Sequence, residues 1–82
     1  MGMTIREFVA RLKRLRAAAG ETRDLSSEAR SAVDGLMGAF RAAYEPEQLK
    51  RAMADDLEVS SDLEERLTTA TLLLNQERTR GA

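Results

Sequence analysis

The chain of 82 residues contains no cysteine, no histidine and no tryptophan. Because cysteine is absent, neither a disulfide framework nor a thiolate zinc site is expected. Because histidine is absent, the chain lacks the commonest general base and the commonest metal ligand in proteins. Catalysis would depend on carboxylates, on Tyr44 or on the lysines Lys13 and Lys50. No Gly-rich phosphate-binding motif occurs either, so we expect a protein that is not an enzyme and uses no metal or cofactor.

The sequence also lacks a long hydrophobic run. A membrane-spanning helix needs about 18 or more consecutive apolar residues, and no such stretch occurs. Basic residues at positions 6, 11, 13, 14 and 16 interrupt the region where a secretory signal needs an apolar core. We therefore expect a cytoplasmic protein without a transmembrane segment.

Aromatic side chains are scarce, since only Phe8, Phe40 and Tyr44 are present. The core must therefore be built mainly from aliphatic side chains. A chain this short buries only about 60% of the surface that its unfolded form exposes. Oligomerisation or a partner often supplements such a modest core.

The stretch 26–44 has the clearest helical periodicity, with bulky apolar residues on one side and small residues on the other. Glycine inside a helix costs about 1 kcal/mol relative to alanine. We expect Gly35 and Gly38, on the small side, to admit another backbone closely, although the alternative is that they are only tolerated. The apolar stripe comprises Leu25, Ala29, Val33, Leu36, Met37, Phe40 and Tyr44.

Three further helices are expected at residues 4–19, 46–57 and 61–78. Pro46 favours a break before the third helix, although a single kinked helix through it is the alternative. Four helices with short connections predict one all-α domain, a small antiparallel helical bundle. In the helix 46–57 the residues expected to point inward are Leu49, Ala52, Met53 and Leu57.

Local signals mark the helix ends. Thr4 with Glu7, and Ser61 with Glu64, have the spacing of a capping box, in which each side chain accepts a backbone N–H group. Gly20 suits the position just beyond a helix end. We therefore expect one helix to begin after Thr4 and end before Gly20, and another to begin after Ser61.

Charge is unevenly distributed along the chain, whose formal net charge is −1. Residues 1–23 carry six basic and two acidic side chains, a net charge of +4. Residues 24–82 carry seven basic and twelve acidic side chains, a net charge of −5. Such halves either neutralise each other within a compact bundle or present charged surfaces to a partner.

Two features favour a surface for a protein partner, although the alternatives are a solvated acidic face near helix starts and a singly exposed leucine of the kind common on proteins. Six acidic residues and no basic one lie between positions 55 and 65, and their spacing does not fit a calcium-binding EF-hand loop. The run Leu72 to Leu74 spreads apolar surface over about 200° of a helix, so Leu72 is expected to point away from the buried stripe. The expected partner-binding residues are Leu72, Leu73, Asp55, Asp56, Glu58, Asp62 and Glu65.

One segment, at about residues 47–67, resembles a helix-turn-helix motif. Ala54 stands where the first helix would face the second, a three-residue turn follows near Val59 and Ser60, and the next helix carries apolar Leu63 and Leu67. The resemblance implies a DNA-binding regulator. The other interpretation is a helical corner without DNA binding, because the second helix is rich in carboxylates that phosphates repel.

The helix 4–19 is the better candidate for nucleic-acid binding. Its basic side chains suit contacts with phosphates, although no aromatic residue lies among them to stack on a base. The alternative is a solvated basic face that balances the acidic helices. The expected nucleic-acid-binding residues are Arg6, Arg11, Lys13 and Arg14.

We therefore expect a small non-enzymatic protein–protein interaction module, such as an adaptor, assembly component or inhibitor, that acts through helical surfaces. Its partner is expected to be another protein, a second copy of the chain, or both. The alternative is a nucleic-acid-associated regulator that uses the basic helix 4–19 or a degenerate helix-turn-helix.

Overall fold

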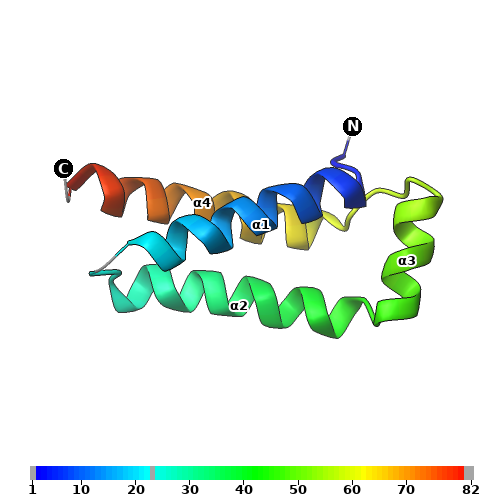
Figure 1. The fold of residues 1–82 in the computed structure, drawn as a ribbon, viewed down its shortest axis with the longest axis horizontal. Helices are drawn as coiled ribbons and strands as arrows, with labels where there is room; N and C mark the ends of the chain where they lie inside the picture. The colour runs from blue at the N-terminus through cyan, green and yellow to red at the C-terminus, as the bar shows by residue number, and fades with distance from the viewer. Residues whose placement is uncertain (1, 23, 81–82) are drawn as a thin grey trace.

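The computed structural model describes residues 2–22 and 24–80. Over these residues the chain forms helices α1 (Ile5–Glu21), α2 (Ser27–Ala43), α3 (Pro46–Ala54) and α4 (Ser61–Arg80). The three longer helices lie side by side, and the short α3 crosses one end (Figure 1). Helix α2 runs antiparallel to both α1 and α4, which run in the same direction. The protein is therefore a small all-α bundle, as the sequence predicts, with principal dimensions of 41 × 23 × 19 Å.

The core is aliphatic with one small aromatic cluster. Helices α2 and α4 have the most extensive contact, and α1 packs against both. The rings of Phe8 and Phe40 lie 5.3 Å apart between α1 and α2, and those of Phe40 and Tyr44 lie 5.6 Å apart. The largest fully buried side chains are Phe8, Ile5, Leu36 and Leu74.

Hydroxyl groups cap the helix starts. The hydroxyl of Thr4 accepts the N–H of Glu7 at 3.3 Å, which confirms Thr4 as the N-cap of α1. The hydroxyl of Ser60 accepts the N–H of Leu63 at 3.3 Å. Ser60, rather than Ser61, therefore caps α4, because Ser61 already has helical geometry as the first residue of that helix.

The end of α1 also differs from the prediction. The helix continues through Gly20 to Glu21, and the N–H of Thr22 donates to the carbonyl of Ala19 at 3.3 Å. Gly20 does not have a positive φ. The helix thus ends without the left-handed residue that a glycine after its end usually supplies.

Helices α2 and α3 are separate at Pro46. Tyr44, the C-cap of α2, has an extended backbone with φ −133° and ψ 115°. Pro46 opens α3, where its missing N–H costs no hydrogen bond. Glu45 completes a capping box, since its N–H donates to Oε1 of Gln48 at 3.0 Å. The predicted break is confirmed, and the kinked continuous helix is wrong.

Helix α3 ends at Ala54, three residues before the predicted end. Residues 55–60 form a connection of six residues, and Asp56 within it adopts a left-handed backbone with φ 55°. Leu57 is 52% exposed instead of pointing inward, and Ala54 is exposed instead of facing α4. The three-residue turn and the packing alanine of the helix-turn-helix resemblance are therefore both wrong.

The backbone of this connection pairs with the N-terminal segment. The N–H of Ile5 donates to the carbonyl of Leu57 at 2.8 Å, and the N–H of Val59 donates to the carbonyl of Met3 at 2.9 Å. Thr4 and Glu58 thereby form an antiparallel bridge. Helix α3 itself ends in local hydrogen bonds, because the N–H groups of Asp56 and Leu57 donate to the carbonyls of Met53 and Ala52 around the left-handed Asp56.

No close backbone approach occurs at Gly35 and Gly38. Both residues are exposed, and a Cβ atom built on either would meet no neighbouring atom within 4 Å. The expectation that these glycines admit another helix is wrong for the described residues.

We predict that Gly35→Ala and Gly38→Ala each stabilise the protein by about 0.5–1 kcal/mol, because alanine loses less backbone entropy in a helix. Urea unfolding followed by circular dichroism measures the change. A loss of stability in either variant would instead indicate that a neighbouring chain packs against the glycines.

We predict that Leu36→Ala lowers the free energy of unfolding by about 2–5 kcal/mol, because the side chain is fully buried at 0% exposure. Leu57→Ala is the matched control and should change it by less than about 0.5 kcal/mol. Equal effects of the two substitutions in urea unfolding would contradict the described core.

Candidate functional site

A groove with a volume of about 570 Å³ lies between α1 and α4. The buried side chains of Leu15, Leu67 and Leu74 lie at its base. Leu72 borders the groove and is 57% exposed. The groove therefore combines an apolar base with an apolar side chain that water still reaches.

The position of Leu72 follows from the geometry of α4. Successive helical residues are rotated by about 100°, so the three consecutive leucines face three directions. Leu74 is buried in the core at 2% exposure, and Leu73 is half-buried beside the start of α2. The prediction that Leu72 points away from the buried stripe is confirmed. Leu73, in contrast, lines a small cavity with Ser26 and Ala29 and does not share the surface of Leu72.

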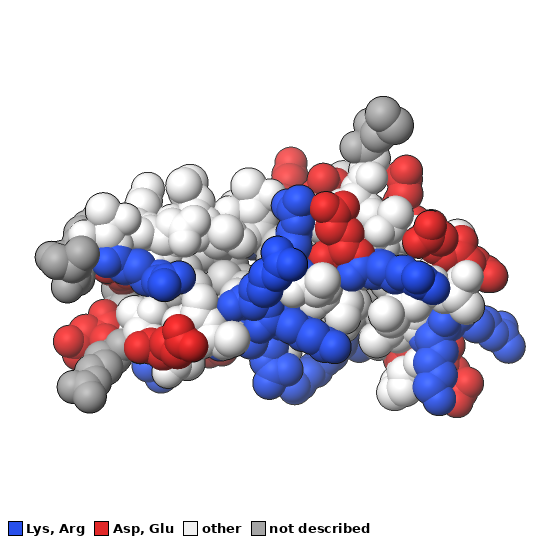
Figure 2. All heavy atoms as spheres, turned by 45° about the horizontal axis from the view of Figure 1, so that its top comes forward, with Lys and Arg blue, Asp and Glu red and all other residues white. Residues whose placement is uncertain are grey.

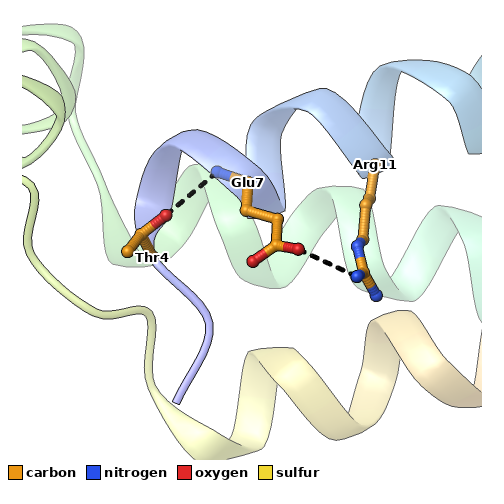
Figure 3. A network of polar contacts seen from close by, with 3 residues as sticks. All are labelled: Thr4, Glu7 and Arg11. Carbon is orange, nitrogen blue, oxygen red and sulfur yellow. Dashed lines mark hydrogen bonds and ion pairs between the residues drawn. The ribbon is translucent and has the colours of Figure 1, made fainter. Parts of the chain in front are cut away.

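Arginine side chains form the rim of the groove. Arg11 and Arg14 come from α1, and Arg78 comes from α4. Nη2 of Arg11 lies 2.9 Å from Oε1 of Glu7, one turn earlier on α1 (Figure 3). Both side chains are about half exposed, and such pairs contribute only about 0.3–0.5 kcal/mol. Arg14 and Arg78 form no ion pair with the described residues.

The other predicted nucleic-acid-binding residues lie elsewhere. Nε of Arg6 donates to the carbonyl of Met53 at 3.1 Å, near the C-terminal end of α3, where a positive charge is favourable. Lys13 is exposed and does not line the groove. The structure therefore brings Arg11 and Arg14 together with Leu72, and gives Arg6 a role in joining α1 to α3.

The predicted acidic residues divide into two groups. Asp55, Asp56 and Glu58 are exposed in the connection between α3 and α4. On α4 itself, Asp62 pairs with Nε of Arg66 at 3.1 Å, and Glu65 is exposed beside a shallow depression.

The first acidic group surrounds a residue that the sequence analysis assigned to the core. Leu57 lies between Asp56 and Glu58 in the chain and is half exposed. Its acidic neighbours are no signal of exposure, because Leu63 lies between Asp62 and Glu64 and is buried at 3% exposure.

The two kinds of charge occupy different parts of the surface. In Figure 2 most basic side chains lie in a band across the middle of the view, and acidic side chains gather toward the upper right. A largely uncharged area extends over the upper left, where the C-terminal half of α4 lies.

Within residues 2–22 and 24–80 no group of three or more acidic side chains is arranged to hold a metal ion. No helix of this part of the chain is long and apolar enough to cross a membrane. Comparison with protein-family models, with curated proteins and with solved structures found no match.

Substitution of Asp56 can test the backbone conformation of the acidic connection. Because its φ is 55°, we predict that Asp56→Gly is more stable than Asp56→Ala by about 1 kcal/mol, the cost of a left-handed backbone for a residue with a Cβ atom. Urea unfolding of the two variants measures the difference. Equal stability, or a more stable alanine variant, would contradict the left-handed backbone.

Proposed function

We propose that the protein is a non-enzymatic protein–protein interaction module whose α1–α4 groove binds an apolar segment that carries acidic side chains. The observation that supports this proposal is the exposed Leu72 beside the arginines of the rim, Arg11, Arg14 and Arg78. An adaptor, an assembly component and an inhibitor all use such a surface, and the cytoplasm is the compartment that we expect.

The apolar part of the groove supplies a driving force for binding. Burying an exposed leucine side chain completely contributes about 1.5–3 kcal/mol, and Leu72 still has 57% of its surface available. Its neighbours along α4 are the short polar residues Thr68, Thr71 and Asn75, which leave the groove open. An amphipathic segment that lays apolar side chains into such a groove is a common mode of recognition.

The rim supplies selectivity for acidic partners. A guanidinium group can donate two parallel hydrogen bonds to one carboxylate, which fixes both position and orientation. Arginine is also enriched among the residues that contribute most to binding at protein interfaces. A partner with carboxylates on either side of an apolar side chain therefore fits this groove better than a basic or uncharged one.

Nucleic-acid binding is the alternative, because phosphates also bind arginine and Lys13 and Arg14 are both exposed. The leucines in the groove favour a protein partner, since they offer nothing to a phosphate. The two candidates differ in how steeply salt weakens binding, because phosphate binding depends mainly on charge, whereas a protein contact keeps its apolar part at high salt.

We predict that immobilised wild-type protein retains a specific protein from a lysate of its source after nuclease treatment. The variant Leu72→Glu should bind that protein with an affinity lowered by about tenfold or more, equivalent to at least about 1.4 kcal/mol. The substitution replaces apolar surface with a carboxylate that repels an acidic partner. Mass spectrometry identifies the retained protein, and titration of the purified pair measures the affinity.

Leu57→Lys is the matched control, because it changes an exposed leucine outside the groove and should leave the captured protein in place. Equal retention by Leu72→Glu and the wild type would contradict the proposed groove. Retention of nucleic acid alone, lost at high salt and in the Arg11→Glu/Arg14→Glu variant, would favour the alternative.

A further inference from the structure

Two large hydrophobic side chains are exposed on the described surface, Leu57 at 52% and Leu72 at 57%. Their electrostatic surroundings are opposite. Leu72 shares its groove with Arg11, Arg14 and Arg78, whereas Leu57 lies in the connection 55–58, whose other three residues are all acidic and exposed. The acidic surroundings of Leu57 are therefore complementary in charge to the basic surroundings of Leu72.

We propose that the groove binds the connection 55–58 of a second copy of this chain, with Leu57 of one molecule packed beside Leu72 of the other. The carboxylates that flank Leu57 then face the arginines of the rim. This inference rests on the proposed protein-binding function of the groove and identifies the segment that occupies it.

The charges of both surfaces are available for such a contact. Asp55, Asp56 and Glu58 form no ion pair with the described residues, and neither do Arg14 and Arg78. Arg11 has only the exposed pair with Glu7, which is weak enough to exchange for a carboxylate of a partner. The contact brings together three carboxylates and three guanidinium groups at a largely apolar groove.

The connection is also held in a defined shape before it binds. The N–H of Leu57 donates to the carbonyl of Ala52 at 3.0 Å, and its own carbonyl accepts the N–H of Ile5 at 2.8 Å. These bonds fix the backbone while the side chain of Leu57 stays exposed. A segment that is already ordered loses less conformational entropy on binding than a flexible loop.

The contact must form between molecules. Leu72 lies eleven residues beyond Ser61, the first residue of α4, which at about 1.5 Å per residue places it more than about 15 Å along the helix from the connection. Two molecules related by a two-fold axis can make the contact twice, each connection lying in the groove of the other molecule, and then close as a dimer. Without that axis each molecule in a pair keeps one unoccupied groove or connection, and the contact continues into rings or open chains.

The test uses two variants that each remove one side of the contact. Leu57→Lys replaces the inserted leucine with a cation that the arginines repel, and leaves the groove intact. Leu72→Glu places a carboxylate in the groove, and leaves the connection intact. Because both leucines are exposed, both variants should keep the wild-type circular dichroism spectrum and unfolding temperature.

Sedimentation equilibrium over a wide concentration range measures the association. We expect the average mass of the wild type to rise with concentration from that of a monomer to that of a dimer or a larger assembly, and to fall when salt is added. Each variant alone should remain a monomer. An equimolar mixture of the two should form a dimer and nothing larger, because the groove of Leu57→Lys accepts the connection of Leu72→Glu and no further site remains.

A wild type that stays monomeric at every concentration would overturn the proposal, as would association of Leu57→Lys equal to that of the wild type. A mixture that stays monomeric while the wild type associates would place the contact elsewhere. If the wild type is monomeric but Leu72→Glu loses a protein that the wild type captures, self-association is wrong and the proposed function of the groove stands. If Leu72→Glu changes neither result, both proposals fail.

Discussion

The backbone pairing between residues 3–5 and 57–59 determines much of this small fold. It joins the start of α1 to the connection that precedes α4. Helices α1 and α4 therefore begin at the same end of the bundle and run in the same direction (Figure 1). Helix α3 ends just before this pairing, where the N–H groups of Asp56 and Leu57 donate to the carbonyls of Met53 and Ala52 around the left-handed Asp56. The pairing thus places the acidic connection, with its exposed Leu57, beside the start of α1.

Helix α4 shows how a short chain with few aromatic residues leaves apolar surface unburied. It packs against α1 and α2 with the stripe of Leu63, Leu67, Ala70 and Leu74. Since consecutive helical residues diverge by about 100°, no arrangement of two neighbouring helices can cover all three leucines at 72–74. Leu73 is partly covered beside α2 and Leu72 is not. The exposed leucine is thus a consequence of helix geometry with only two long helices for α4 to pack against.

Sequence signals between neighbouring residues predicted the four helices. Features that depend on contacts between distant parts of the chain were not predicted. Capping by Thr4 and the break at Pro46 depend on neighbours in the chain, and both are confirmed. Leu57 lies beyond the end of α3, in a connection whose backbone pairs with residues more than fifty positions away, and periodicity within 46–57 reveals neither. Gly35 and Gly38 were misjudged because a stripe of small residues does not say whether a neighbour exists. For the site, the sequence supplied Leu72, Arg11 and Arg14 separately, and only the structure places them in one groove.

The ion pairs between described residues do not join the basic and the acidic parts of the chain. The ion pairs Arg11–Glu7 and Arg66–Asp62 each join residues one turn apart on a single helix, so they hold no two helices together. Exposed pairs of this kind add little stability. The acidic residues 55–58 lie in the connection between α3 and α4, whereas the arginines of the groove lie on α1 and α4. In the contact that we propose, these surface charges would determine which partner binds. Opposite charges on a partner would favour binding, and like charges would oppose it.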